Sequence, residues 1–302
     1  MSGEPSRYRD ASAPDYGHGF HAGNVGDVWK HLGLAEALRL ARSRTGPVRY
    51  FESHAGEGRY RLGSTGEWSA GVERVAAMVD AAPDAVAEPV ARWLGLCRRL
   101  GYAGRSSSFA GSPEIARASL GPDDRLSLWE RDAHAHARLA RLLGDDPRVR
   151  VVLGDGLPGL AREVREAEPG AGAVVVLIDP PWTAKDDWIR VPDALADAVE
   201  ATTRATFLLW YPVKSLTRPN AMLARLAARG LRSTVAELVT TPLELRRSRL
   251  NGSGLLAVRP PEGWARAMAS SAPSIGAACA THRGAWSLRL LDSGDPLSGT
   301  AE

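Results

Sequence analysis

The tetrapeptide Asp179-Pro180-Pro181-Trp182 directly follows a run of apolar, mostly β-branched residues, 173–178. Such a run predicts a buried parallel strand, and open α/β sheets bind their ligands at the carboxyl ends of strands. An acid, two prolines and an aromatic residue at that place suit methylation of an exocyclic amine. The Asp179 carboxylate and nearby backbone carbonyls would accept the amine's hydrogens, while Trp182 would stack on the base. The alternative is a strand end with a proline-rich loop.

Glycines and acidic residues stand at or after the ends of three further predicted strands, in an order that bears on the cofactor. They are Gly56 and Gly58 after strand 48–52, Glu130 at the end of strand 125–130, and Asp155 and Gly156 after strand 149–153. In a nucleotide-cofactor fold the glycine turn lets the backbone approach the cofactor, and the acid of the second strand binds the ribose. An acid after the third strand is placed to bind the adenine of S-adenosylmethionine. The order therefore predicts a methyltransferase that uses this cofactor.

Chemistry dependent on NAD is the nearest enzymatic alternative. It predicts a full Gly-x-Gly-x-x-Gly fingerprint, but Arg61 stands where the third glycine belongs. The sequence therefore disfavours a dinucleotide-binding dehydrogenase.

Two histidines and a serine are further candidates for the cofactor site. His54 lies inside the glycine turn, where its imidazole would reach the methionyl carboxylate, and His31 belongs to a polar segment near the amino terminus. For either histidine a structural role is the alternative. Ser112 precedes Pro113 and Glu114, which predicts a helix N-cap that also faces the carboxyl edge of the sheet.

The remaining patterns predict a doubly wound α/β sheet. A further strand is expected at 206–211, and an antiparallel hairpin at 235–239 and 255–258. Asn24 is expected to cap a helix that runs to about Arg42. Residues 66–101 show helical spacing between two strands, which predicts a helical insertion at about 62–110 within a domain of residues 16–292. Residues 1–15 and 293–302 are expected to form an arm and a tail.

Composition narrows the function classes further. The chain has 302 residues, 44% of them hydrophobic, which is enough for a large core. It has no apolar run of the ~18 residues that a membrane span needs, so we expect a cytoplasmic protein that does not contact membranes. The two cysteines, Cys97 and Cys279, have no metal-like spacing, so no metal site is expected.

On several motifs the chain resembles the bacterial 23S ribosomal RNA adenine-N6 methyltransferases of the RlmJ type. The resemblance covers roughly residues 16–264 and rests on these segments: Tyr16-x-His18-x-Phe20-His21-Ala22-Gly23-Asn24, Asp27, Lys30-His31, His54-Ala55-Gly56-x-Gly58-Arg59-Tyr60, Gly111-Ser112-Pro113, Asp155-Gly156, Asp179-Pro180-Pro181 and Trp210-Tyr211-Pro212. The His-Ala-Gly-Asn segment is specific to this family. The family has Tyr where this chain has Trp182, and Asp where it has Glu52.

The resemblance implies a role for each matching residue. Asp179 would be the catalytic proton acceptor, and Tyr16, His18 and Lys30 would line the target adenine. The implied contacts to S-adenosylmethionine are His31, His54, Ser112, Glu130, Asp155 and Gly156. The implied partner is 23S ribosomal RNA, naked or at an early stage of assembly, with no membrane and no metal.

Two other functions stay open at this stage. A DNA adenine methyltransferase shares the Asp-Pro-Pro-aromatic turn, although no large target-recognition domain is evident. A catalytically silent RNA-binding assembly factor would carry a broken cofactor pocket. Separately, the loop Arg246-Arg247-Ser248-Arg249-Leu250-Asn251-Gly252 either binds phosphates at the mouth of the site or is a solvated hairpin turn.

Overall fold

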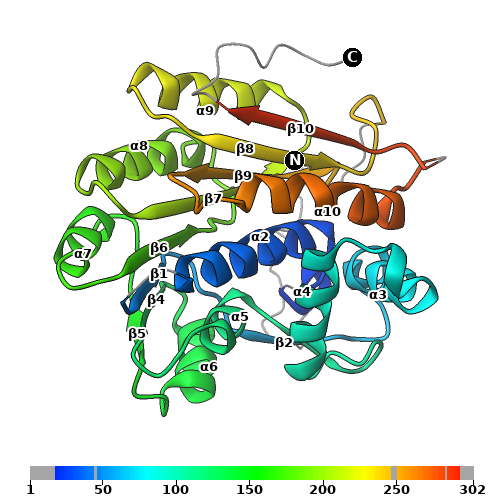
Figure 1. Ribbon diagram of the computed structural model, residues 1–302, viewed down its shortest axis with the longest axis horizontal. Helices are drawn as coiled ribbons and strands as arrows, with labels where there is room; N and C mark the ends of the chain where they lie inside the picture. The colour runs from blue at the N-terminus through cyan, green and yellow to red at the C-terminus, as the bar shows by residue number, and fades with distance from the viewer. Residues whose placement is uncertain (1–17, 44–45, 246–249, 283, 293–302) are drawn as a thin grey trace, which may run out of the picture.

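The computed structural model describes residues 18–43, 46–245, 250–282 and 284–292. Its centre is an eight-stranded mixed sheet with the order β10-β8-β9-β7-β6-β1-β4-β5 (Figure 1). The strands of this sheet are β1 (Val48–Glu52), β4 (Arg125–Glu130), β5 (Val149–Leu153), β6 (Ala173–Ile178), β7 (Thr206–Val213), β8 (Thr234–Val239), β9 (Gly252–Val258) and β10 (Ser287–Asp292). Strands β5, β4, β1, β6 and β7 run parallel, and β9 is antiparallel to both β7 and β8. This is the class I S-adenosylmethionine methyltransferase fold, as the sequence predicted.

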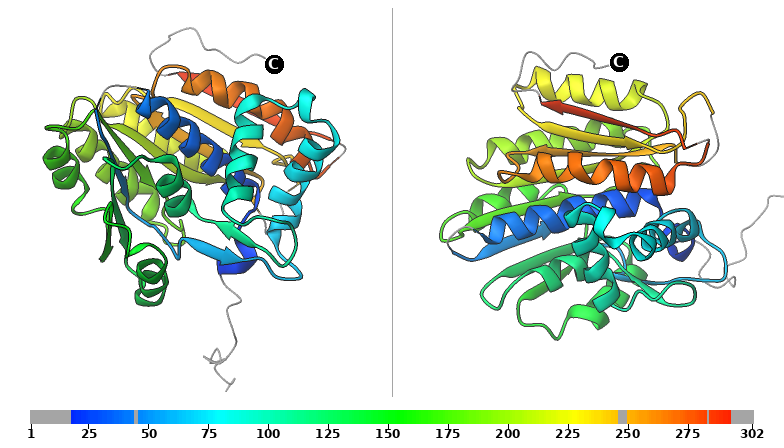
Figure 2. Two further views of the ribbon diagram at one scale, coloured as in Figure 1. Left: turned by 60° about the horizontal axis from the view of Figure 1, so that its bottom comes forward. Right: turned by 45° about the vertical axis from the view of Figure 1, so that its right-hand side comes forward.

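Helices cover both faces of the sheet (Figure 2). One face carries α2 (Val25–Arg42), α5 (Ser112–Ser119), α6 (Ala133–Leu143) and α10 (Trp264–Cys279). The other face carries α7 (Leu160–Ala167), α8 (Asp187–Glu200) and α9 (Thr217–Ala228). Strand β6 is buried from Val174 to Ile178 because both layers cover it. Burial of each such side chain contributes about 1.5 to 3 kcal/mol, so the strand that carries Asp179 is firmly fixed.

The segment after the first strand forms a separate layer of small elements. A short antiparallel pair, β2 (Arg59–Arg61) and β3 (Ser108–Ala110), brackets η1 (Glu67–Ala70), α3 (Val72–Ala81), η2 (Pro83–Ala85) and α4 (Glu88–Arg99). Helices α3 and α4 pack against α10, and α4 also packs against α2. Figure 1 shows these helices beside the sheet, next to the amino-terminal end of α2. The predicted insertion boundaries at 62 and 110 lie next to β2 and at the end of β3.

The amino-terminal end of α2 forms as the sequence predicted. The Asn24 side chain accepts a hydrogen bond of 2.9 Å from the backbone N–H of Asp27, so Asn24 is the N-cap of a helix that ends at Arg42. Helix α1 (His18–His21) precedes it. Because α2 leads into β1, its first turns lie at the carboxyl edge of the sheet.

The structure extends the predicted carboxyl-terminal part of the sheet. Strand β10 pairs antiparallel with β8 and was not predicted. It is an edge strand whose side chains all stay at least partly exposed, so it has no strong apolar alternation to detect. The predicted arm at 1–15, the tail at 293–302 and residues 246–249 of the arginine loop lie outside the described residues.

Candidate active site

The ends of four strands and the start of two helices converge at the carboxyl edge. Glu52 ends β1, Glu130 ends β4, Asp155 follows β5 and Asp179 follows β6. Because neighbouring parallel strands end at the same edge, residues far apart in the sequence become neighbours here. Ser112 opens α5 at the same edge.

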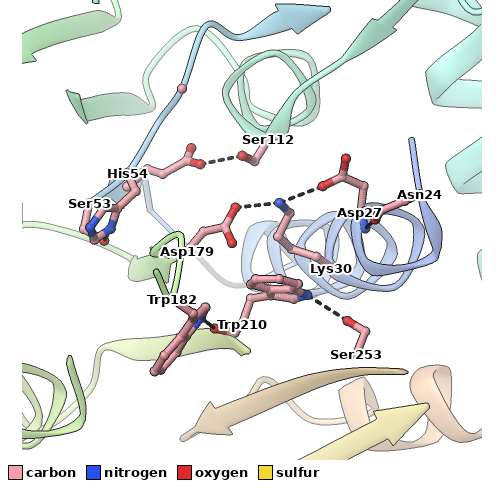
Figure 3. Close-up of polar contacts among 12 residues, drawn as sticks. Asn24, Asp27, Lys30, Ser53, His54, Ser112, Asp179, Trp182, Trp210 and Ser253 are labelled. Carbon is pink, nitrogen blue, oxygen red and sulfur yellow. Dashed lines mark hydrogen bonds and ion pairs between the residues drawn. The ribbon is translucent and has the colours of Figure 1, made fainter. Parts of the chain in front are cut away.

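Asp179 lies in a buried ion cluster with two residues of α2 (Figure 3). The Lys30 ammonium is 2.5 Å from Oδ2 of Asp179 and 2.9 Å from Oδ1 of Asp27. Lys30 reaches Asp27 because residues three apart share a helix face. Two carboxylates thus share one ammonium, so the cluster carries one net negative charge when all three groups are ionised.

Burial and charge act against each other in this cluster. Burial raises the pKa of Asp179, and the Lys30 charge only partly offsets that rise. Burial opposes the charge of Lys30, but the carboxylates of Asp179 and Asp27 outweigh it and raise the pKa of Lys30 well above its usual range. Lys30 therefore stays charged at any physiological pH, and the acid stays next to a fixed cation.

His31, the residue after Lys30, points to the other side of α2. Its imidazole stacks on Phe109 of β3, with ring centroids 5.6 Å apart and planes 18° apart. Burial lowers the pKa of His31 to about 3, with the Lys30 charge second, so the ring is neutral. Its Nδ1 is buried and has no hydrogen-bond partner among the described residues. A buried nitrogen without a partner costs free energy unless a ligand satisfies it.

The glycine turn after β1 is held by Glu130. One carboxylate oxygen accepts the N–H of Gly56 at 2.8 Å, and the other accepts the N–H of Asp132 at 2.7 Å. Gly56 and Gly58 have φ values of 63° and 78°, where a side chain would be strained. In the same turn the Nδ1 of His54 lies 2.8 Å from the Ser53 hydroxyl, and burial lowers the pKa of His54 to about 4.

The loop after β5 packs closely against the end of β1. A Cβ on Gly156 would lie 2.7 Å from both Cα and the carbonyl oxygen of Ser53, so only glycine fits there. Asp155 accepts the N–H of Leu157 at 3.0 Å and pairs with Arg190 at 2.9 Å. Burial alone would raise the pKa of Asp155, but these two donors hold it below its usual range.

Ser112 is not the N-cap that the sequence predicted. Gly111 occupies that position in extended backbone, and Ser112 is the first helical residue. Its hydroxyl donates to Oε1 of Glu52, while Oε2 accepts the Tyr50 hydroxyl at 2.8 Å. Burial raises the pKa of Glu52 to about 8, although both hydrogen bonds favour its ionised form.

Two tryptophans lie below Asp179 in Figure 3. Trp182 is 8% exposed, donates its indole N–H to the Trp210 carbonyl at 3.0 Å, and packs on Trp188 with centroids 4.3 Å apart. Its φ of 53° is a strained value for a tryptophan, and such strain concentrates at functional sites. Trp210 is half-buried, and its N–H donates to the Ser253 hydroxyl at 2.7 Å. The stacking role of Trp182 stays a prediction.

The residues at this edge fit S-adenosylmethionine. The unpartnered Nδ1 of His31, the neutral His54 and the buried hydroxyl of Ser112 are polar groups near the glycine turn. Glu130 ends β4 and Asp155 follows the adjacent strand β5, so both carboxylates lie at the edge where open α/β folds bind nucleotide cofactors. When bound, this cofactor would supply a methyl group attached to a sulfonium sulfur. The positive sulfur makes the methyl carbon electrophilic enough to be attacked by an amine.

The predicted site residues are therefore mostly neighbours. Tyr16 lies outside the described residues, and for His18 only its place in α1 is described. The sequence motifs included Trp210 and Asp27 but gave neither a role, and the pairing of Asp27 with Lys30 was missed. The available signal was their spacing, because residues three apart in a helix lie on the same face and can form an ion pair. Among the described residues no cluster of three metal-binding side chains occurs, and no helix is long and apolar enough to cross a membrane.

Comparisons with known proteins identify the family of the chain. The family profile described as "Ribosomal RNA large subunit methyltransferase D, RlmJ" matches residues 45–291. The chain belongs to the RlmJ family. It is 32% identical over 253 residues to the ribosomal RNA large subunit methyltransferase J of Haemophilus influenzae, covering 82% of this chain and 87% of that protein. The Escherichia coli protein of that name is 31% identical over 252 residues, with the same coverage.

A solved structure supports the fold of this RlmJ-family chain. The crystal structure of a Legionella pneumophila protein superposes with a TM-score of 0.79 and covers 90% of this chain and 98% of that one, at 24% identity. At that level of identity the likeness concerns the fold. It includes nearly the whole chain, so the helical insertion and the sheet belong to one shared architecture.

Proposed function

We propose that this chain transfers a methyl group from S-adenosylmethionine to N6 of one adenine in 23S ribosomal RNA. Its membership of the RlmJ family and the large-subunit RNA specificity in the names of its relatives support the substrate class. The single observation that carries the chemistry is the placement of Asp179, at the end of β6, in a cluster with one net negative charge.

That charge suits amine methylation. As the adenine nitrogen attacks the methyl carbon in line, the carbon–sulfur bond breaks and positive charge develops on the nitrogen. Asp179 and the Pro180 carbonyl accept the amine's hydrogens, which orients the nitrogen lone pair, and the negative cluster stabilises the developing charge. The released proton passes to Asp179 and then to solvent.

The cofactor-side roles follow from the same edge. His31, His54, Ser112, Glu130, Asp155 and Gly156 would hold the cofactor, with Glu130 on the ribose and Asp155 on its adenine. Lys30 would line the target base together with Tyr16 and His18 of the amino-terminal segment. Trp182 would offer the base an aromatic contact.

The decisive experiment compares ribosomal RNA from cells with and without the gene. Nucleoside mass spectrometry with site mapping should find one N6-methyladenosine missing from 23S RNA, and wild-type protein but not an Asp179→Ala variant should restore it. Unchanged RNA with a mark lost from genomic DNA would assign the protein to DNA instead. Retention of every methyl mark in both nucleic acids would favour a silent assembly factor.

The stage at which the protein acts is tested in vitro. We expect deproteinised 23S RNA to be methylated and assembled large subunits to be poor substrates, because a target base must be unstacked to reach a buried acid. Equal rates on both would contradict an early role.

A further inference from the structure

Trp210 lies across the Lys30 ammonium from the proposed catalytic acid. Lys30 Nζ is 2.5 Å from Asp179 and 5.5 Å from the centre of the Trp210 ring (Figure 3). The sheet sets this arrangement, because Ile178 of β6 is in register with Leu209 of β7. The residues that follow, Asp179 and Trp210, are therefore side by side at the carboxyl edge.

Trp210 differs in exposure from its neighbours on β7. Leu209 and Tyr211 are fully buried, whereas the Trp210 side chain is half-buried and faces the ion cluster. Its edge also lies against α2, where a Cβ on Gly26 would come within 3.2 Å of Cζ2. The Trp210 indole therefore offers an aromatic surface to a ligand bound next to Asp179.

The orientation of this ring is fixed from behind. Ser253 of β9 is fully buried and accepts the indole N–H at 2.7 Å. Strand β9 holds Ser253 in place because Pro212 and Ser253 are in register. This hydrogen bond restricts rotation of the Trp210 ring in the free protein. Less conformational entropy is then lost when a ligand binds, which favours binding.

Trp182 is arranged differently. Its N–H is bound to the Trp210 carbonyl, and one face is covered by Trp188. Trp182 is thus tied to the backbone of Trp210 and is more deeply buried than Trp210 is. The two indoles form one assembly in which the half-buried ring is the one beside the Lys30–Asp179 pair.

We propose that Trp210 is a base-contacting wall of the target-adenine pocket and that Ser253 is a positioning residue that sets its ring. This inference rests on the proposed methylation of adenine. Lys30 contacts Oδ2 of Asp179, so Oδ1 can accept a hydrogen of the amine beside the ammonium. The purine attached to that amine then lies next to the indole of Trp210, on which it can stack.

The test compares two RNA hairpins that contain the mapped target site, one with adenine and one abasic at that position. Trp210→Leu should weaken binding of the adenine hairpin by about 5- to 150-fold, as loss of one base–aromatic stack does. It should weaken the abasic hairpin far less and leave S-adenosylmethionine affinity within about twofold. Trp210→Phe keeps an aromatic face and should retain most of the affinity. Trp286→Leu, which removes a half-buried ring packed on α10, is the matched control and should change neither hairpin.

The positioning role has its own test. Ser253→Ala should weaken the adenine hairpin by about 2- to 12-fold in the wild-type background, which corresponds to one hydrogen bond. In a Trp210→Phe background the same substitution should have no effect on the adenine hairpin, because phenylalanine has no N–H to place. This pair of variants keeps the proposal testable if Trp210→Leu folds poorly.

The outcomes separate this inference from the proposed function. If wild-type protein methylates the hairpin but Trp210→Leu weakens the adenine and abasic forms equally, or weakens neither, the wall assignment is wrong and the function stands. An equal effect of Ser253→Ala in both backgrounds overturns the positioning role. If wild-type protein methylates no 23S adenine, the proposed function fails first.

Discussion

Lys30→Met is the perturbation for which the structure gives the clearest magnitude. Methionine fills a similar volume without the charge, so the change leaves the carboxylates of Asp27 and Asp179 facing each other in the buried cluster. The Lys30 side chain is 9% exposed, and those of Asp179 and Asp27 are 14% and 21% exposed. Breaking a buried ion pair from one side costs about 3 to 5 kcal/mol. The partial exposure of both acids places the expected loss near the lower end, about 3 kcal/mol.

The loss of stability caused by Lys30→Met should be larger at high pH than at low pH. Burial already raises the pKa of Asp179, and removal of the Lys30 charge that opposes this rise will raise it further. A carboxyl whose folded pKa exceeds its unfolded value adds stability at low pH and loses it as pH rises through the folded pKa. The deficit of the variant relative to wild type should therefore be full at pH 8 and smaller at pH 5, by about 1 kcal/mol or more.

Thermal melts at the two pH values measure this effect. At pH 8 the variant should melt roughly 6 °C lower, at about 2 °C per kcal/mol for a chain of this size. Lys30→Met combined with Asp27→Asn removes one of the two facing charges and should recover part of the loss. Lys185→Met, at an exposed position, is the control and should change little. A deficit that is absent, or equal at pH 5 and pH 8, would refute the assignment of a buried cluster.

Substitutions at three further residues test the assigned roles. Asp179→Ala should abolish methyl transfer in a tritiated-methyl assay while calorimetry finds S-adenosylmethionine affinity nearly unchanged; retained turnover would remove Asp179 from the mechanism. Glu130→Ala should weaken cofactor binding by about 10- to 150-fold, the value of a charge-assisted hydrogen bond, and an unchanged affinity would reject the ribose contact. Trp182→Ala should lower stability by about 3 to 5 kcal/mol because the ring is buried, and Trp182→Tyr should retain most activity. An alanine variant that melts low but methylates normally while folded would show that Trp182 only packs.

The strand ends of the site could be predicted from the sequence because each has a local signal. Asp179 follows an apolar run, Glu130 ends the predicted strand 125–130, and Asp155 follows the predicted strand 149–153. The order of these acids indicates the fold, because the carboxyl ends of parallel strands meet at one edge of the sheet. The fold class therefore followed from the order of short segments, each of which is weak alone, whereas the family followed from the motifs that the chain shares with it.

What the sequence could not predict depends on contacts between distant residues. Lys30 and Asp179 are 149 positions apart, and nothing local marks them as a pair. Strand 206–213 is mostly apolar, so its composition does not mark Trp210 as a site residue, whereas the contact of its half-buried ring with Lys30 is evident only in the folded sheet. The cap assigned to Ser112 was wrong because backbone conformation, rather than residue type, decides which residue precedes the first helical turn, and Glu52 engages the serine hydroxyl instead.

Helix α2 explains why an amino-terminal segment belongs to this site at all. Its consecutive residues Lys30 and His31 make different contacts: Lys30 pairs with Asp179, the proposed catalytic acid, and His31 stacks on Phe109 of β3. The same helix face carries Asp27 and the cap Asn24, whose amide donates to Glu67 of η1 at 3.0 Å. A continuous polar path thus joins the insertion to the proposed catalytic acid.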